Sequence, residues 1–121
     1  MVVTSCFTDM HIDYISIFAS KKEMSSFVDL NLSNPLRNAL EDLAFKAPTP
    51  IQESAFPVIM SGRDMVGIAQ TGTGKTMAYL MPLLNNLKFS KDPNPKILVL
   101  VPTRELVIQV IEQVELLTKY M

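Results

Sequence analysis

The clearest chemical signal in the sequence is an eight-residue run, Ala69-Gln70-Thr71-Gly72-Thr73-Gly74-Lys75-Thr76. It departs from the general phosphate-loop pattern (Gly, four residues, then Gly-Lys-Ser/Thr) only at the first position, which is Ala69. Gly72 and Gly74 permit positive φ, so successive backbone N–H groups can point at phosphate oxygens. Lys75 can reach the β- and γ-phosphates of a nucleoside triphosphate, and the Thr76 hydroxyl can ligate Mg²⁺. The alternative is a glycine-rich turn with a chance Lys-Thr pair.

The residues on either side of this run predict the elements that position it. Residues 64–69 form a short apolar run bounded by turn residues, which indicates a buried strand. A helix is expected from Lys75, with a bend at Pro82. This context supports a nucleoside triphosphate site, but it does not distinguish a kinase from a GTPase or a helicase.

Two helices are expected before the strand. The first begins at Ser33-Asn34-Pro35 and ends near Lys46. The second begins at Thr49, which forms a capping box with Gln52 and is followed by proline. It runs to about Met60, and Gly62 suits its end, although Pro57 predicts a kink or an early break.

A second buried strand is expected at residues 96–101, which are apolar on both faces, and a last helix follows a cap at Thr103. From residue 64 onward the order is therefore strand, loop, helix, strand, helix. That order predicts an α/β fold with a parallel sheet and right-handed crossovers.

Composition limits the class of protein. The chain has 121 residues, 48% hydrophobic and 19% charged, which suits one small domain and excludes collagen and charge-driven disorder. A net charge of −1 excludes a broadly basic surface for binding nucleic acid, so any nucleic-acid contact must be local. Because Cys6 is the single cysteine, an internal disulfide and a structural metal site built on cysteine are excluded. The single His11 adds little as a possible metal ligand. No apolar run reaches membrane-span length and no secretory signal is visible, so we expect a cytoplasmic protein.

Residues 1–23 have no clear periodicity, whereas the pattern from Met24 onward is well defined. One hypothesis is that residues 1–23 are an upstream extension, disordered or preceding the native start. The alternative is an ordered N-terminal helix or strand. Residues 24–121 form the domain under either hypothesis.

Three motifs in order resemble those of the DEAD-box RNA helicases. Residues 45–52, Phe-Lys-Ala-Pro-Thr-Pro-Ile-Gln, resemble the Q motif, and Phe27 stands where the family has an upstream aromatic residue. Residues 69–76 resemble motif I, in which Ala at the first position is usual, and residues 102–106, Pro-Thr-Arg-Glu-Leu, resemble motif Ia. Gly62-Arg63-Asp64, just before the strand that leads into the phosphate loop, also fits the pattern of this family. One minor departure is Ala44, where the family commonly has Gly; we expect an ordinary φ there.

The resemblance implies a RecA-like domain that binds ATP with Mg²⁺. It implies that Gln52 contacts the adenine edge with help from backbone near Lys46, that Phe27 packs against the base, and that Lys75 and Thr76 serve catalysis. Pro102, Thr103 and Arg104 would contact the RNA backbone, which carries no sequence information. From the residues alone, Gln52 could instead serve only the capping box, Phe27 only the core, and Arg104 only a capped helix surface.

The motifs expected after motif Ia do not occur. There is no Asp-Glu-Ala-Asp or Ser-Ala-Thr sequence, and no second lobe with an arginine finger. We therefore expect the N-terminal part of the first RecA-like lobe, ending before the Walker B strand, which binds adenine nucleotide without hydrolysing it. A non-catalytic regulatory module and another P-loop enzyme, such as a small kinase, are the alternatives; the Q-motif and motif-Ia residues argue against the kinase.

Overall fold

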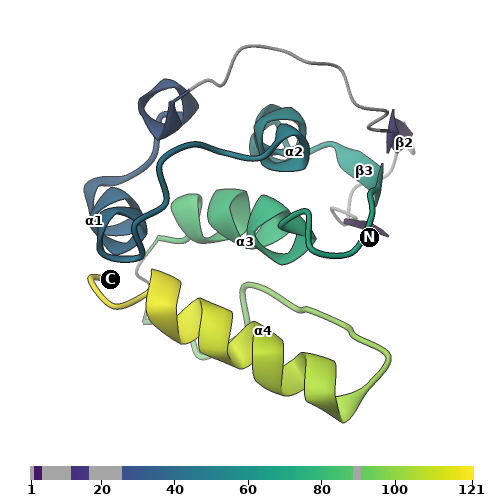
Figure 1. Cartoon of the computed structure of the whole chain (residues 1–121). Helices are drawn as coiled ribbons and strands as arrows, with labels where there is room; N and C mark the ends of the chain where they lie inside the picture. Colours follow the sequence, from purple (N-terminus) through teal and green to yellow (C-terminus); the bar gives the residue numbers. More distant parts are fainter. Residues whose placement is uncertain (1, 4–11, 17–25, 89–90) are drawn as a thin grey trace.

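The protein has an α/β architecture in which helices dominate (Figure 1). The computed structural model describes residues 2–3, 12–16, 26–88 and 91–121. The elements are β1 (Val2–Val3), β2 (Ile12–Ser16), the 3₁₀ helix η1 (Phe27–Leu30), α1 (Asn34–Asp42), α2 (Pro50–Met60), β3 (Asp64–Ile68), α3 (Lys75–Asn85) and α4 (Arg104–Leu117). Cys6 and His11, which were considered above as ligands, lie outside the described residues.

The predicted strand before the phosphate loop is confirmed as β3, and it is the central strand of the described sheet. β2 pairs with β3 in parallel, from Ile12 opposite Asp64 to Ser16 opposite Ile68. β1 pairs with the other edge in antiparallel orientation, with Val2 opposite Val66. The parallel neighbour of β3 therefore comes from residues 1–23, the stretch for which an extension and an ordered element were both open.

The predicted strand at residues 96–101 is wrong. The segment is extended but is assigned to no strand and pairs with no other strand among the described residues. Leu98 and Leu100 are 80% and 84% exposed, whereas alternate residues face the helices. The sequence carries the apolar character of a strand, but a strand also needs a neighbour to complete its hydrogen-bond ladder.

The helix starts agree with expectation because they are set by local signals, whereas α1 ends at Asp42, before the expected end near Lys46, because Ala44 closes it in a left-handed conformation. Thr49 and Gln52 form the capping box at the start of α2, and Gly62, at φ 76°, follows its end. The predicted break at Pro57 does not occur, since α2 continues to Met60. Buried residues on either side of Pro57, Phe56 and Ile59, hold this helix against the core, so packing outweighs the lost backbone hydrogen bond.

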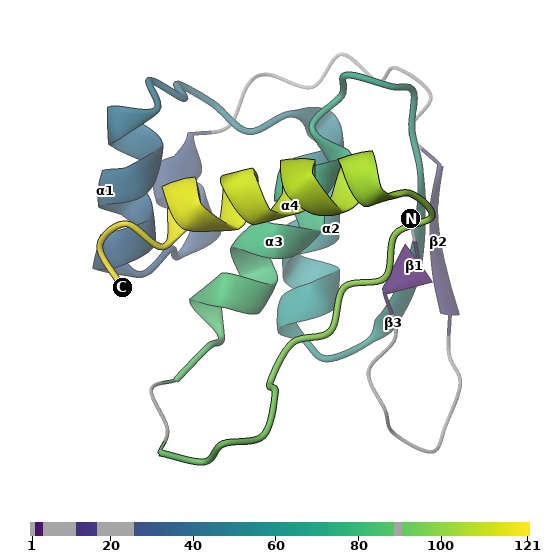
Figure 2. The ribbon, with the colours of Figure 1, turned by 90° about the horizontal axis from the view of Figure 1, so that it is seen from below.

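The core consists of two apolar clusters with α3 between α2 and α4 (Figures 1 and 2). The larger cluster comprises Phe27, Leu30, Leu32, Leu36, Leu40, Phe56, Met77, Leu80, Met81, Leu84 and Leu117. The smaller comprises Ile51, Ala55, Ile59, Met65 and Ala78. Tyr79 packs against both clusters. Helix α3, which follows the phosphate loop, is thereby fixed on two sides.

The expectation of an ordinary φ at Ala44 is wrong. Ala44 lies in the left-handed region at φ 55°. Its N–H donates to the Glu41 carbonyl at 2.9 Å, and the Phe45 N–H donates to the Leu40 carbonyl at 3.1 Å. These two bonds form a Schellman motif at the end of α1, which requires a left-handed residue after the C-cap. The motif persists with alanine because its hydrogen bonds offset the steric cost.

We predict that Ala44→Gly stabilises the protein. Relief of the left-handed strain, about 1–2 kcal/mol, exceeds the added unfolded-state entropy of glycine, so the net gain is about 0.5–1 kcal/mol. Thermal denaturation should show a rise of roughly 2–6 °C. Asn38→Gly, at an exposed position inside α1, is the matched control and should destabilise by about 0.5–1 kcal/mol. A loss of stability in Ala44→Gly would contradict the strain assigned to Ala44.

The end of the chain is tied to α1 through one carboxylate. Asp42 Oδ2 accepts hydrogen bonds from Lys119 Nζ and from the Tyr120 hydroxyl, both at 2.5 Å. The Lys119 bond, and then the Tyr120 bond, hold the pKa of Asp42 below its ordinary value. Because the folded-state pKa is the lower one, this stabilisation is present at neutral pH and is lost as pH falls through the folded-state pKa.

Lys119→Met should therefore lower the urea midpoint at pH 7, and the difference from wild type should shrink and then vanish as the pH falls through the lowered folded-state pKa of Asp42. Lys88→Met, which removes another exposed lysine, should leave the midpoint nearly unchanged over the same pH range. Urea titrations across this range provide the measurement. A difference between Lys119→Met and wild type that stays constant down to the lowest pH would exclude the contact with the Asp42 carboxylate as its source.

Candidate functional site

The phosphate-loop residues join the end of β3 to the start of α3 and have the backbone conformation that their glycines predict. Gly72 lies at φ 78°, and Gly74, the N-cap of α3, lies at φ 82°. Helix α3 begins at Lys75 and has 11 residues. Its first turn offers free amides and the positive end of the helix dipole, both of which favour an anion.

The Lys75 amine lies against the loop itself. Nζ donates to the Ala69 carbonyl at 2.6 Å and to the Gln70 carbonyl at 2.5 Å. The Thr73 hydroxyl donates to the same Gln70 carbonyl at 2.7 Å. Two side chains of the loop thus converge on its own carbonyl groups, and these bonds hold the ammonium group at the loop where phosphate would bind.

The Gln52 side chain connects the start of α2 to the phosphate loop. Oε1 accepts from the Thr49 N–H at 3.0 Å, which confirms the capping role. Nε2 donates to the Gly74 carbonyl at 3.2 Å, a contact that the sequence did not predict. Gln52 is only 3% exposed, so both bonds lie away from solvent. One amide therefore links two motifs that are separated by 22 residues in the chain.

The residues that could serve a metal ion are limited. Thr76 lies in the first turn of α3, and its side chain is hydrogen-bonded to Tyr79, one turn further along. Burial raises the pKa of Tyr79, and the bond to Thr76 opposes that shift. In the part of the chain that the structure describes, no cluster of three or more His, Cys, Asp or Glu residues could hold a metal ion. The Thr76 hydroxyl is suited to be one ligand of a Mg²⁺ ion whose other ligands come from phosphate and water.

The other predicted adenine-site residues occupy different environments. Phe27, in η1, is 8% exposed and belongs to the larger core cluster, as the core-packing alternative for this residue proposed. Lys46 is exposed in the connection between α1 and α2. The helix α2 that carries Gln52 packs against η1, so Phe27 supports that helix from the core side.

The predicted RNA-contacting residues form the exposed start of α4. Thr103 is the N-cap, and its side-chain oxygen accepts from the Leu106 N–H at 3.3 Å. Its hydroxyl proton remains available for donation. Pro102 and Arg104 are exposed. Among the described residues, no hydrogen bond joins Thr103 or Arg104 to the phosphate loop. The start of α4 and the phosphate loop are therefore separate sites.

Asn85 has a structural role that the sequence did not predict. Its Oδ1 accepts from the Ser33 N–H at 2.7 Å, and its Nδ2 donates to the Asn31 carbonyl at 3.4 Å. Asn85 thus ties the end of α3 to the segment that joins η1 and α1. No local pattern marks this role, because an asparagine at a helix end is equally suited to being an ordinary terminal residue.

The geometry defines a P-loop nucleotide-binding unit of the RecA-like type: a strand, a glycine-rich loop and a helix, with a glutamine contacting the loop from a neighbouring helix. A family model described as DEAD/DEAH box helicase matches residues 49–121. The chain therefore belongs to the DEAD/DEAH box helicase family. None of the described helices has the length and apolar character needed to cross a membrane.

Curated relatives agree with this assignment. "ATP-dependent RNA helicase DeaD" of Klebsiella pneumoniae and of Escherichia coli are each 48% identical over 100 residues, which is 80% of this chain and 15% of the relative. "DEAD-box ATP-dependent RNA helicase 28" of Oryza sativa is 43% identical over 115 residues, 90% of this chain and 14% of the relative. The chain thus spans about 15% of the length of these relatives.

Solved structures show the same relationship. The RNA helicase Prp28 from Chaetomium thermophilum, bound to ADP, matches with a TM-score of 0.71 and 36% identity over 79% of this chain and 24% of that one. A DEAD box protein from Methanococcus jannaschii matches with a TM-score of 0.70 and 35% identity over 77% of this chain and 25% of that one.

We predict that Gly74 and Gln52 are energetically coupled. A Cβ on Gly74 would lie 2.4 Å from Gln52 Nε2, and the residue also has φ +82°, so Gly74→Ala must displace the glutamine. Gly72→Ala is the matched control, since Gly72 has φ +78° but a Cβ there would meet no atom within 4 Å. Both should cost about 1–2 kcal/mol in backbone strain, and Gly74→Ala should cost more.

Urea denaturation of the single and double variants with Gln52→Ala provides the test. Gln52→Ala should relieve part of the Gly74→Ala loss, with a coupling energy of about 0.5–3 kcal/mol, and should not relieve the Gly72→Ala loss. Additive losses for Gln52 and Gly74 would show that the close approach does not determine the stability of the loop.

Proposed function

We propose that this chain is the ATP-binding and RNA-backbone-contacting part of a DEAD-box RNA helicase, which unwinds or remodels RNA with ATP in the longer protein. The observation that carries this proposal is the contact between the Gln52 amide and the Gly74 carbonyl. It brings the residue expected to recognise adenine into contact with the loop expected to bind phosphate. A phosphate site without base recognition would not need that link.

Phosphate binding at this loop involves an exchange of hydrogen bonds. Lys75 is held by the Ala69 and Gln70 carbonyls, so a nucleotide must draw the amine to its β- and γ-phosphate oxygens. Charged phosphate oxygens are stronger acceptors than neutral carbonyls, which favours the exchange. The amides of the glycine-rich loop and of the first turn of α3 would hold the remaining oxygens.

Adenine recognition by Gln52 would use its remaining hydrogen-bonding capacity. A glutamine oxygen can accept two hydrogen bonds and its nitrogen can donate two, and the structure uses one of each. The exocyclic amine and a ring nitrogen of adenine can supply the complementary donor and acceptor. Guanine carries a carbonyl oxygen in place of the exocyclic amine, so the Gln52 oxygen in this fixed orientation would lose its donor, which favours adenine. Backbone near Lys46 would complete the base contact.

The remaining roles follow the positions of the residues. Pro102, Thr103 and Arg104 would contact RNA phosphates at the start of α4, which offers first-turn amides and the exposed Arg104. Mg²⁺ would enter with ATP and take Thr76 as one ligand, and a second RecA-like lobe would complete the catalytic machinery. We also propose a reducing, cytoplasmic location, on the basis of the single cysteine.

An alternative is a nucleotide-binding module without catalysis. After Arg104 the acidic residues are Glu105, Glu112 and Glu115, all of them on α4. None follows a buried strand, where a Walker B carboxylate would hold Mg²⁺ and orient water. The 121-residue chain on its own is therefore expected to bind nucleotide without turnover.

Nucleotide titrations of the 121-residue chain test the site. We expect ATP to bind more tightly than GTP in the presence of Mg²⁺. Lys75→Ala should weaken both nucleotides by about 10–100-fold with their ratio unchanged, because it removes charge-assisted phosphate bonds. Gln52→Ala should reduce the ATP-to-GTP preference by about 3–10-fold. Equal binding of ATP and GTP by the wild type would refute the adenine assignment, and binding insensitive to Lys75→Ala would refute the phosphate site.

An RNA-stimulated ATPase assay on the same material tests the absence of turnover. We expect no phosphate release above the Lys75→Ala background, since the second set of Mg²⁺ ligands and the arginine finger each contribute factors of about 10³ or more. Turnover that disappears in Lys75→Ala would show that this chain contains the complete catalytic set.

A further inference from the structure

The Gln70 carbonyl of the phosphate loop accepts hydrogen bonds from two side chains of the same loop. The Thr73 hydroxyl donates to it at 2.7 Å, and the Lys75 amine donates to it at 2.5 Å. The Lys75 amine also donates to the neighbouring Ala69 carbonyl at 2.6 Å. When a nucleotide binds, the two bonds from Lys75 have to be exchanged for bonds to phosphate. The bond from Thr73 does not depend on that exchange.

The Thr73 side chain is directed at the loop itself. Thr73 lies between Gly72 and Gly74, both of which have positive φ, and its hydroxyl bonds back to the carbonyl of the residue three positions earlier. Threonine side chains make local bonds of this kind in turns, without help from the rest of the protein. A hydroxyl has a single proton to donate, so while this bond is formed the Thr73 hydroxyl cannot donate to a phosphate oxygen.

We propose that Thr73 is a positioning residue of the phosphate loop, which keeps the Gln70 carbonyl hydrogen-bonded while Lys75 moves from the loop to the nucleotide. A carbonyl oxygen has two lone pairs, and two donors use them as long as Lys75 lies against the loop. After Lys75 has moved, the bond from Thr73 remains. Without the hydroxyl, the same movement would leave the carbonyl with no partner from the loop, which would oppose binding. This inference rests on the proposed function, because bound phosphate is what draws Lys75 away.

Two other roles for Thr73 would have different consequences. If its bond to Gln70 were equally strong with and without Lys75 on the same carbonyl, loss of the hydroxyl would lower stability and leave nucleotide affinity unchanged. If the hydroxyl turned to phosphate, its loss would lower affinity by the same factor whether or not Lys75 is present. Only the proposed exchange makes the effect of Thr73 on affinity depend on Lys75.

Titration of the 121-residue chain with ATP and Mg²⁺ tests the proposal. Thr73→Val should weaken binding by about 3–10-fold, the value of one hydrogen bond whose acceptor is left open. Thr73→Ser, which keeps the hydroxyl, should restore binding close to the wild-type affinity. Thr118→Val is the matched control. It removes a hydroxyl that donates to the Val114 carbonyl at 2.8 Å at the end of α4, and it should leave ATP binding unchanged.

The same substitution in a Lys75→Ala background separates the three roles. In that background no amine leaves the Gln70 carbonyl when nucleotide binds, so Thr73→Val should change ATP affinity by less than about twofold. A loss of about 3–10-fold there would indicate a direct contact with phosphate and overturn the proposal. ATP affinity that Thr73→Val leaves unchanged in the presence of Lys75 would indicate a purely structural bond and would also overturn it.

Urea denaturation without nucleotide distinguishes failure of this inference from failure of the proposed function. In the free protein Thr73 and Lys75 share one carbonyl, so the double variant Thr73→Val, Lys75→Ala should lose more in urea midpoint than the two single variants together. Additive losses would overturn the shared role of the Gln70 carbonyl, whatever the chain binds. Greater-than-additive losses in a chain that binds no ATP would refute the proposed function and, with it, the exchange.

Discussion

The hydrogen bonds of one buried amide connect the local structures from which the nucleotide site is built. Gln52 accepts from the first residue of the α2 capping box and donates to the Gly74 carbonyl, so the start of α2 and the start of α3 share a single side chain. The cost of burying an amide is offset only while both bonds are formed. Any movement of the phosphate loop away from α2 would leave the glutamine nitrogen and the loop carbonyl without partners. The positions of α2 and α3 in the core therefore determine the shape of the loop.

The absence of a side chain at Gly74 makes this contact possible. The carbonyl that accepts from Gln52 belongs to a residue with positive φ and with no room for a Cβ. Gly72 has a similar φ but open space around it. The two glycines of the loop thus serve different purposes: Gly72 supplies backbone conformation, and Gly74 supplies conformation together with close approach. A motif written as letters does not separate these roles, whereas the surrounding atoms do.

Features encoded within a few residues were predictable from the sequence. The capping box at Thr49, the stop at Gly62 and the strand–loop–helix order around Lys75 are all confirmed, since each depends on neighbours in the chain. Features that depend on distant groups were not predictable. The hydrogen bond from Gln52 to Gly74 and the hydrogen bond between Asn85 and Ser33 depend on how the helices pack. Nothing in the surrounding sequence marks either one. Ala44 shows that a hydrogen-bonded helix end can impose a left-handed conformation on a residue that disfavours it.

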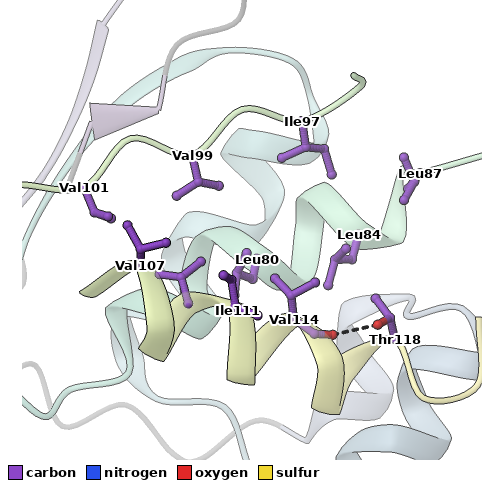
Figure 3. A pocket seen from close by; sticks show the side chains of 11 residues that line it. Leu80, Leu84, Leu87, Ile97, Val99, Val101, Val107, Ile111, Val114 and Thr118 are labelled. Atoms are coloured by element: carbon purple, nitrogen blue, oxygen red, sulfur yellow. Dashed lines mark hydrogen bonds between the residues drawn. The ribbon is translucent and has the colours of Figure 1, made fainter. Parts of the chain in front are cut away.

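The error at residues 96–101 has the same origin. A continuous apolar run identified a segment able to form a strand, but a strand exists only with a partner, and in the described sheet β3 pairs with β1 and β2. The inner residues of the segment face α3 and α4 across an apolar hollow of about 400 Å³, and Ile97 also packs against the larger core cluster (Figure 3). The outer leucines of the segment, Leu98 and Leu100, are 80% and 84% exposed. Orientation of side chains and pairing of backbone are separable requirements: this segment turns alternate side chains toward the helices but has no backbone partner among the described residues.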